Sequence, residues 1–234
     1  MARQPLTEKV ADDIIQLIRQ SKMRPGERLA NEYELAQKLN VGRGSLREAI
    51  KILISRNILF VKQGSGTFVS AGQGIPTDPL GLTFVENRVK MATDLIEIRL
   101  MVEPEIAAMA AANAGPVDSE KIYRAAELVE HLIGEGEEYS QADVDFHRKV
   151  AEASGNMVIT SLIPIIHTEE ALAEVNQSPG FVENVRKYHK IIADSIAFGE
   201  IKDAKYAMFM HLNLLREALL DRFIGEREQR VPNL

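Results

Sequence analysis

Three histidines and one aspartate have the types and spacing to bind a metal ion. Asp143 and His147 are four residues apart, so on one helix they project from the same face and can hold a single cation. His189 and His211 each replace an apolar residue in a stripe with helical spacing, which predicts that both point into a helical bundle. A buried imidazole is costly without a partner, and one shared metal ion would satisfy all three.

Each of these residues also has a simpler interpretation. A single histidine on an apolar face is more often a hydrogen-bonded core residue than a ligand, and Asp143 could complete a capping box with Ser140. The combination of three inward histidines with a carboxylate at i−4 favours the metal site. His131 and His167 have no carboxylate at i−4, and we assign them to the surface or the core.

The histidines lie in a long C-terminal segment, residues 85–234, that we expect to fold as one domain. Its first apolar stripe consists of Met91, Leu95, Ile98 and Val102. Further stripes with helical period cover residues 119–133, 141–153, 157–175, 182–198 and 203–223. Pro104 and Pro164 fall inside these stretches and should kink a helix or mark its first turn. With no strand pattern present, the segment predicts an antiparallel bundle of about six or seven helices.

Residues 1–72 have a different organisation, with three short helices followed by a hairpin. The first helix should run from about Leu6 to Ser21, and Arg24-Pro25-Gly26 should stop it. Asn31 can cap the second helix, because Glu34 stands three residues later. After a break at residues 40–42, the third helix should bury Leu46, Ala49, Ile50 and Leu53.

The third helix and the hairpin supply the features of a DNA-binding surface. Arg43, Arg47 and Lys51 form an i, i+4, i+8 stripe on the face beside the apolar one, where it can enter a major groove. Asn57 should end this helix in a left-handed conformation. Strands at 58–61 and 67–69 then flank a glycine-containing tip that can approach a phosphate backbone closely. This layout predicts a winged helix-turn-helix.

The charge distribution agrees with binding of DNA by the first domain, although a stripe of charges is more often only a solvated helix face. Residues 1–72 hold 12 Lys and Arg against 7 Asp and Glu, a formal charge of +5, and the rest of the chain holds 16 against 27, a formal charge of −11. Phosphate contacts dominate DNA affinity, so a basic module suits DNA binding even within an acidic protein.

Composition and length add further expectations. The 234 residues allow a small DNA-binding domain and a second domain of about 150 residues. Residues 73–84, rich in glycine and proline, should be the linker between them. Because the chain has no cysteine, it has neither disulfides nor thiolate metal sites. With no apolar run near the ~18 residues that span a bilayer, and no signal-peptide core at the start, we expect no membrane partner and a cytoplasmic location.

The N-terminal motifs resemble those of the GntR family of bacterial transcription regulators. The resemblance rests on the segments Arg24-Pro-Gly-Glu-Arg-Leu, Glu32-x-x-Leu-Ala, Val41-x-Arg-x-x-Leu-Arg-Glu-Ala49 and Gly64-x-Gly-Thr-Phe-Val69. It implies that Arg43 and Arg47 contact operator bases and phosphates, and that Gly64 lies at the wing tip in the minor groove. We expect the DNA contacts to come from Arg43, Ser45, Arg47, Lys51, Lys62, Gln63 and Gly64.

The second domain resembles the FCD ligand-binding domain of the FadR subfamily. This resemblance covers residues 90–223 and rests on Glu97-Ile-Arg99-x-x-x-Glu103, Asp143-x-x-Phe-His147, Ser154-Gly-Asn156, His189 and His211. It implies that Asp143, His147, His189 and His211 bind a divalent metal in the bundle. Such a donor set suits Zn²⁺ best, with Ni²⁺, Mn²⁺ or Fe²⁺ as alternatives.

Arg99 is the expected effector contact, because a planar guanidinium matches a carboxylate bidentately. A local ion pair with Glu103, one turn further on, is a nearly equal alternative.

Together these features predict a homodimeric repressor that binds a near-palindromic, double-stranded operator. A small carboxylate, such as a sugar acid or a hydroxy acid, would bind at the metal and Arg99 and release the DNA of a carboxylate-metabolism operon. One alternative is a purely structural metal with a different effector. Another is a metal-dependent hydrolase, since a metal with open positions can activate water, but no motif supplies a second acid or base.

Overall fold

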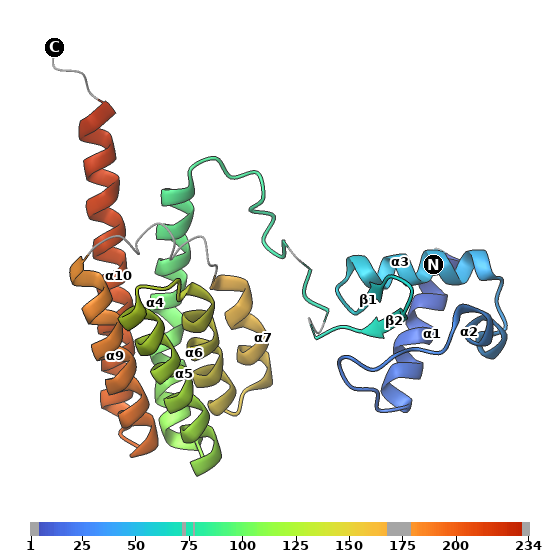
Figure 1. The fold of residues 1–234 in the computed structure, drawn as a ribbon, viewed down its shortest axis with the longest axis horizontal. Coiled ribbons are helices and arrows are strands. Elements are labelled where there is room, and N and C mark those ends of the chain that lie inside the picture. Colours follow the sequence, from blue (N-terminus) through green and yellow to red (C-terminus); the bar gives the residue numbers. More distant parts are fainter. Residues whose placement is uncertain (1–4, 72–73, 77, 168–178, 231–234) are drawn as a thin grey trace. The chain divides into compact units, whose positions relative to one another are not determined.

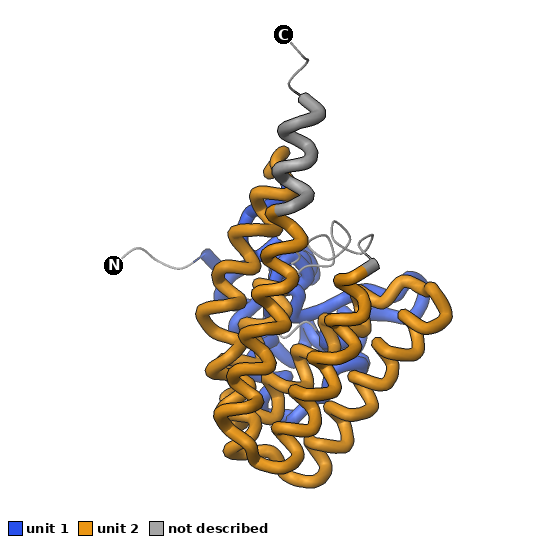
Figure 2. Tube along the Cα trace, turned by 90° about the vertical axis from the view of Figure 1, so that its left-hand side faces the viewer, with its two compact units in different colours: residues 1–83 blue, residues 84–234 orange. Residues whose placement is uncertain are grey.

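The computed structural model describes residues 5–71, 74–76, 78–167 and 179–230, with the side chains of residues 179 and 221–230 excepted (Figure 1). The chain divides into two compact units, residues 1–83 and 84–234 (Figure 2). The predicted fold class is confirmed, because the described residues are mainly helical and their two-stranded sheet is a hairpin in the first unit. None of the described helices is both long enough and apolar enough to cross a membrane.

The described residues of the first unit form three helices and a hairpin in the predicted order. They are α1 (Leu6–Gln20), α2 (Glu32–Leu39), α3 (Arg43–Ser55), β1 (Leu59–Lys62) and β2 (Gly66–Val69). The side chain of Asn31 caps α2 by accepting a 2.9 Å hydrogen bond from the backbone N–H of Glu34. Asn57 has a φ of 51°, so the predicted left-handed end of the third helix is confirmed.

The wing is a tight antiparallel hairpin whose register runs from Leu59↔Val69 to Lys62↔Gly66. Each strand is offset by about one residue from the sequence prediction, because the ladder continues through Lys62 and Gly66 up to the turn. Residues 26–29 run beside β2, bound through backbone hydrogen bonds of 2.9 Å from Gly26 N to Val69 O, from Leu29 N to Thr67 O and from Val69 N to Glu27 O. This pairing sets Arg28 opposite Phe68.

The core of the first unit forms where α1 and α2 pack against α3. The apolar face predicted for the third helix is buried, with relative exposures of 7% or less at Leu46, Ala49, Ile50 and Leu53. Burying this stripe fixes the rotation of α3 and leaves its cationic stripe at the surface.

The second unit is an all-helical bundle. Its described helices are α4 (Arg88–Asn113), α5 (Pro116–Glu135), α6 (Ser140–Ala153), α7 (Met157–Ile166), α9 (Pro179–Ala197) and α10 (Ile201–Arg230). Helix α4 packs against α6, α9 and α10, and α5 packs against α6 and α9 (Figure 1). The inward faces of α4, α6, α9 and α10 therefore meet inside one core.

Two details of the predicted bundle are wrong. Ile98, predicted in the inward stripe of the first helix, is 44% exposed, because the buried face of α4 instead includes Arg99 and Glu103. The helix predicted over residues 157–175 ends at Ile166, and its part from 168 on lies outside the described residues. Pro104 and Pro164 both lie inside helices, past the first turn.

Candidate metal centre and DNA-binding surface

The four predicted metal ligands meet in the core of the second unit. Asp143 and His147 project from α6, His189 from α9 and His211 from α10, and none is more than 3% exposed. Each offers one donor atom, and these four atoms lie within 4.8 Å of one another. Three helices thus direct one carboxylate and three imidazoles to a common point.

The spacing of the donor atoms matches a first-row transition metal. Zn–N bonds of about 2.0–2.1 Å place tetrahedral ligands roughly 3.3 Å apart. Asp143 Oδ1 lies 3.2 Å from His189 Nε2, and His147 Nε2 lies 3.2 Å from His211 Nε2. The other oxygen of Asp143 lies 3.9 Å from His147 Nε2. Two of these three spacings are thus close to those of a tetrahedral zinc site, and the third is longer.

Hydrogen bonding leaves much of this cluster unsatisfied. Asp143 and His189 are buried, and neither the carboxylate oxygens of the first nor the ring nitrogens of the second have a hydrogen-bond partner. The 3.2 Å contact between Asp143 Oδ1 and His189 Nε2 is therefore not an aligned N–H···O hydrogen bond. Buried polar groups without a partner destabilise a fold, and a shared cation would satisfy them together. The residues therefore fit a divalent metal by donor type, spacing and unmet bonding capacity.

Electrostatics keeps these groups in the forms that bind metals. Burial raises the pKa of the Asp143 carboxyl, but the facing imidazoles lower that pKa by more, and His189 has the largest effect among them. The pKa of Asp143 therefore lies well below its usual range. Burial lowers the pKa of His189, and lowers that of His211 further. Near pH 7 the aspartate is therefore ionised and these two imidazoles are neutral.

A buried chain of contacts joins α4 to the cluster. Arg99 Nε donates a 2.6 Å hydrogen bond to one oxygen of Glu103, whose other oxygen contacts His147 Nδ1. Arg99 Nη2 also lies 3.4 Å from His147 Nε2. Burial raises the pKa of Glu103, but Arg99 and His147 outweigh it and hold the pKa at about 2. The local ion pair considered for Arg99 is thus present, and the same side chain also borders the donor cluster.

Sequence reasoning missed two polar groups at this site. His167 follows α7, is 3% exposed, and places Nε2 3.6 Å from Asp143 Oδ2. Both of its nitrogens, and the buried hydroxyl of Tyr139, have no hydrogen-bond partner. Assigning His167 to the surface or core therefore overlooked its contact with the cluster. The capping box considered for Asp143 is not formed, because Glu138 accepts the hydrogen bond from the Ser140 backbone N–H.

Three of the predicted DNA-contacting residues of α3 lie on one accessible face, and Ser45 lies on another. Arg43, Arg47 and Lys51 are exposed, and Ser45 is half-buried. Arg47 Nε lies 2.7 Å from Glu32 Oε2, whereas Arg43 has no ion pair with any described residue. Exposed ion pairs contribute only about 0.2–1 kcal/mol, so DNA phosphates can displace the carboxylate.

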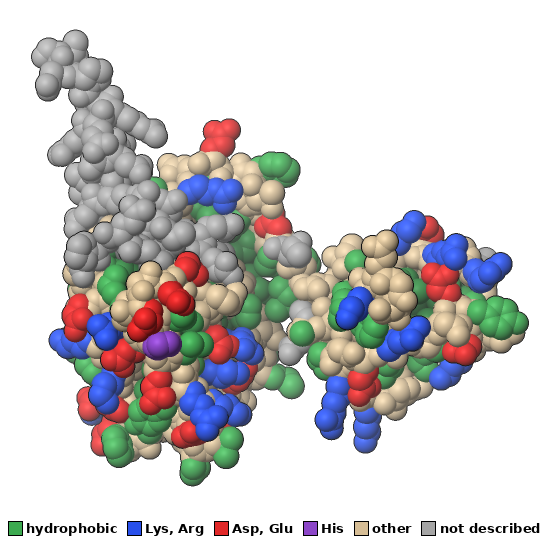
Figure 3. Space-filling view, in the orientation of Figure 1, with side chains coloured by type: hydrophobic (Ala, Val, Ile, Leu, Met, Phe, Trp, Pro, Cys, Tyr) green, Lys and Arg blue, Asp and Glu red, His purple; other side chains and the backbone are tan. Residues whose placement is uncertain are grey.

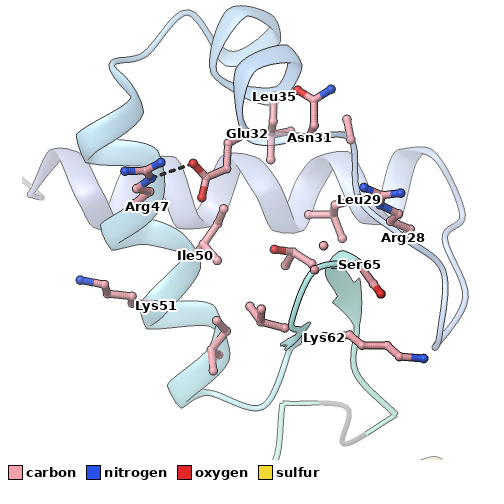
Figure 4. Close-up of a pocket in the computed structure, with 16 residues that line it drawn as sticks. Arg28, Leu29, Asn31, Glu32, Leu35, Arg47, Ile50, Lys51, Lys62 and Ser65 are labelled. Carbon is pink, nitrogen blue, oxygen red and sulfur yellow. Dashed lines mark hydrogen bonds and ion pairs between the residues drawn. The ribbon is translucent and has the colours of Figure 1, made fainter.

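The predicted wing residues surround the turn between β1 and β2. Lys62 ends β1, Gln63 is exposed, and Gly64 has a φ of 72°, a conformation that favours glycine. A cleft of about 510 Å³ separates this turn from α3 (Figure 4). On the face of the first unit that Figure 3 shows, Lys and Arg side chains lie at the surface with fewer Asp and Glu among them.

Comparisons with known proteins match each unit to a family. The family described as "Bacterial regulatory proteins, gntR family" matches residues 6–69, and the FCD domain family matches residues 94–214. The second match contains every metal-ligand candidate and Arg99, and the first contains every predicted DNA contact.

Individual relatives cover nearly the whole chain. A regulatory protein of Escherichia coli K12 named for the L-lactate dehydrogenase operon is 31% identical, over 92% of this chain and 86% of that protein. The transcriptional repressor NanR of Enterobacter sp. 638 is 28% identical, over 91% of this chain and 85% of that protein. The solved structure of a GntR protein from Streptococcus agalactiae is 33% identical with a TM-score of 0.78, over 90% of this chain and 99% of that one.

Proposed function

Because the chain belongs to the gntR family of bacterial regulatory proteins and contains an FCD domain, we propose that it is a metal-dependent repressor released by a small hydroxy acid. Its activity as a transcriptional regulator follows from the family. The proposal adds the metal, the class of effector and the direction of the response. A repressor of operator DNA acts in the cytoplasm, which is where we place it.

The observation that supports this proposal most is the convergence of four buried donors beside a guanidinium, among which Asp143 and His189 have no hydrogen-bond partner. Asp143, His147, His189 and His211 form a donor set typical of Zn²⁺, and Ni²⁺, Mn²⁺ and Fe²⁺ accept the same types of ligand. When bound, such a metal supplies a positive centre with open coordination positions. Arg99 borders that centre, and its unused N–H groups suit a carboxylate.

The polar groups of the site favour a small polar effector. The buried Tyr139 hydroxyl and the His167 ring nitrogens have no hydrogen-bond partner. They can form hydrogen bonds with hydroxyl groups of an effector. An α-hydroxy acid offers both a carboxylate and a neighbouring hydroxyl. The E. coli relative named for the L-lactate dehydrogenase operon supports the same class, and lactate is its simplest chiral member. Sugar acids share this chemistry.

DNA binding is proposed to use two copies of the chain. Helix-turn-helix dimers place two recognition helices in successive major grooves of a near-palindromic operator. Arg43 and Arg47 on α3 would contact the operator, with the wing beside it. If the effector lowers the affinity for the operator by some factor, linkage requires that the operator lower the affinity for the effector by the same factor.

Two alternatives make different predictions. A purely structural metal would stabilise the bundle but leave the effector elsewhere, so chelation would lower the melting temperature while the shift produced by the effector would not depend on the metal. A hydrolase has less support, since the family consists of regulators and the groups around the cluster serve binding equally well.

A thermal-shift experiment tests the proposed effector class. We expect L-lactate or gluconate, at about 100 times its Kd, to stabilise the zinc-loaded protein by about 2.7 kcal/mol and raise its Tm by several degrees. Chelation should abolish this shift, and acetate, which lacks the hydroxyl, should produce a smaller one. Equal shifts with and without metal would contradict the metal-assisted site. Tighter operator binding with saturating effector would contradict the role of repressor released by its ligand.

A further inference from the structure

Glu103 lies between Arg99 and His147 in the interior of the second unit. It is 1% exposed, and both of its carboxylate oxygens have a partner. Arg99 reaches it from one turn earlier on α4, and His147 reaches it from α6. Burying a carboxylate so completely is costly unless each contact is made, so this position requires an ionised acid with two fixed donors.

The contact with His147 determines which ring nitrogen faces the donor cluster. A carboxylate accepts a hydrogen bond, so the nitrogen beside Glu103 is the protonated Nδ1. In a neutral imidazole, Nε2 then has the free lone pair, and Nε2 is the nitrogen that faces Asp143 and His211. A carboxylate behind a metal-binding histidine fixes both its tautomer and its ring orientation.

We propose that Glu103 is the positioning residue of the metal site, and that it acts on metal binding through His147. This inference rests on the proposed metal function. Glu103 is not one of the four residues of the cluster and contacts His147 at Nδ1, on the other side of the ring from Nε2. Glu103, His147 and His167 form a second group whose donor atoms lie within 4.8 Å of one another, and the contact with Nδ1 favours the positioning role for Glu103. Because it also holds Arg99 through Nε, Glu103 sets the orientation of the residue expected to bind the effector.

Glu103→Gln is the direct test, with Glu105→Gln as its matched control. Glu105 lies on the same helix but is exposed and paired with Lys205 at the surface. Loss of a partner behind a metal ligand typically weakens metal affinity about 10–100-fold. We expect that loss of Zn²⁺ affinity in Glu103→Gln, measured by competition with a chromophoric chelator, and no change in Glu105→Gln. Wild-type affinity in Glu103→Gln would overturn the proposal.

A second measurement uses the wild-type protein and does not depend on the variant folding. Two-bond ¹H–¹⁵N NMR correlations of the histidine rings in the metal-free protein should show His147 protonated at Nδ1. Protonation at Nε2 instead would overturn the positioning role. If the wild-type chain bound none of Zn²⁺, Ni²⁺, Mn²⁺ and Fe²⁺, the proposed metal function would fail. If it bound one of them and Glu103→Gln bound it equally well, only the positioning role would fail.

A separate observation concerns Arg28, at the wing side of the cleft in the first unit. Figure 4 shows Arg47 and Lys51 on the α3 side of the cleft, and Arg28 and Lys62 on the side of the wing. Arg47 and Lys51 are paired with Glu32 and Glu48. Within the described part of the chain, Arg28 and Lys62 form no ion pair.

The Arg28 guanidinium lies against the wing at Gly66. A Cβ added at Gly66 would lie 2.8 Å from Arg28 Nε, so the guanidinium passes directly over this residue, whose φ of 122° itself favours glycine. The backbone pairing of residues 26–29 with β2 sets the direction of Arg28 across this glycine. Arg28 therefore lies along the wing backbone at the edge of the cleft.

We infer that Arg28 binds a DNA phosphate in the cleft between α3 and the wing. This second inference rests on DNA binding by the first unit. When α3 occupies a major groove and the wing the adjacent minor groove, the phosphate strand that separates the two grooves must pass between them. Cations on both walls of the cleft suit that strand, and Arg28 can bind a phosphate bidentately.

The salt dependence of non-specific DNA binding tests this contact without knowledge of the operator. The logarithm of the binding constant falls with the logarithm of salt concentration by about 0.9 per neutralised phosphate. We expect Arg28→Gln to make this slope less steep by about 0.9 for each bound head, measured by anisotropy with a labelled 30-bp duplex. Arg28→Lys should retain most of the slope, because lysine keeps the charge.

Arg124→Gln controls for the loss of one positive charge, because Arg124 is exposed on α5 in the other unit. An equal change of slope in Arg124→Gln and Arg28→Gln would overturn the inference, and so would an unchanged slope in Arg28→Gln. If the wild-type chain bound no DNA, the premise of DNA binding would fail instead.

Discussion

Asp143→Asn will weaken the affinity for Zn²⁺ by more than about a hundredfold. The carboxylate supplies the negative charge of the donor set, and its two oxygens face three imidazoles without a hydrogen-bond partner. Loss of a residue behind a ligand costs about 10–100-fold, so loss of the ligand itself should cost more. Isothermal titration or competition with a chelator measures the change directly.

The same substitution should remove the thermal stabilisation by metal. At a free Zn²⁺ concentration of 1,000 times Kd, binding stabilises the wild-type fold by about 4.1 kcal/mol, equivalent to roughly 10 °C for a chain of this size. We expect Asp143→Asn to lose most of that shift. Asp145→Asn is the matched control, because Asp145 lies two residues later on α6 and pairs with Arg148 outside the cluster. A full metal-dependent shift in Asp143→Asn would place the metal elsewhere in the chain.

The sequence predicted features whose causes are local. Asn31 caps α2 through a hydrogen bond within three residues, and the left-handed Asn57 ends α3 through its own backbone conformation. The hairpin follows from β-prone residues on both sides of a glycine turn. The candidate ligands His189 and His211 were detectable because each interrupts an apolar stripe that is otherwise buried.

The prediction from sequence was wrong where buried polar residues do not interrupt an apolar stripe. On α4, the stripe through Ile98 seemed apolar enough to face the core. Arg99 was predicted as an effector contact, with a local ion pair to Glu103 as the alternative, and the burial of the two residues was not predicted. The structure buries both, because Glu103 and His147 satisfy each other across two helices. A partner 44 residues away leaves no periodic signal in the chain.

His167 was missed for a related reason. It stands just past the end of α7, where helical periodicity stops, and its carboxylate neighbour Asp143 belongs to another helix. An i−4 search detects ligands that share a helix, such as Asp143 and His147, but not those that meet by packing. The tertiary arrangement of α6 and α7 supplies the missing contact.

Arg43→Ala will reduce affinity for the specific operator by at least about 30-fold. A bidentate contact between arginine and a base contributes about 1–3 kcal/mol, and a dimer loses two such contacts, so the expected cost is roughly 2–6 kcal/mol per operator. Arg43 begins α3 and is exposed without an ion pair among the described residues, so its guanidinium is available to DNA. The operator can be obtained by selection from random duplexes, and affinities can be measured by anisotropy.

The comparison with Arg47→Ala separates base recognition from phosphate binding. Arg47 must give up its contact with Glu32 to bind DNA, so its substitution should cost less than that of Arg43. Loss of a base contact weakens binding to the selected operator far more than binding to a scrambled duplex. Loss of a phosphate contact weakens binding to both duplexes equally. Equal losses on both duplexes in Arg43→Ala would assign Arg43 to phosphate binding. Unchanged binding in both variants, with both proteins folded, would move the recognition surface away from α3.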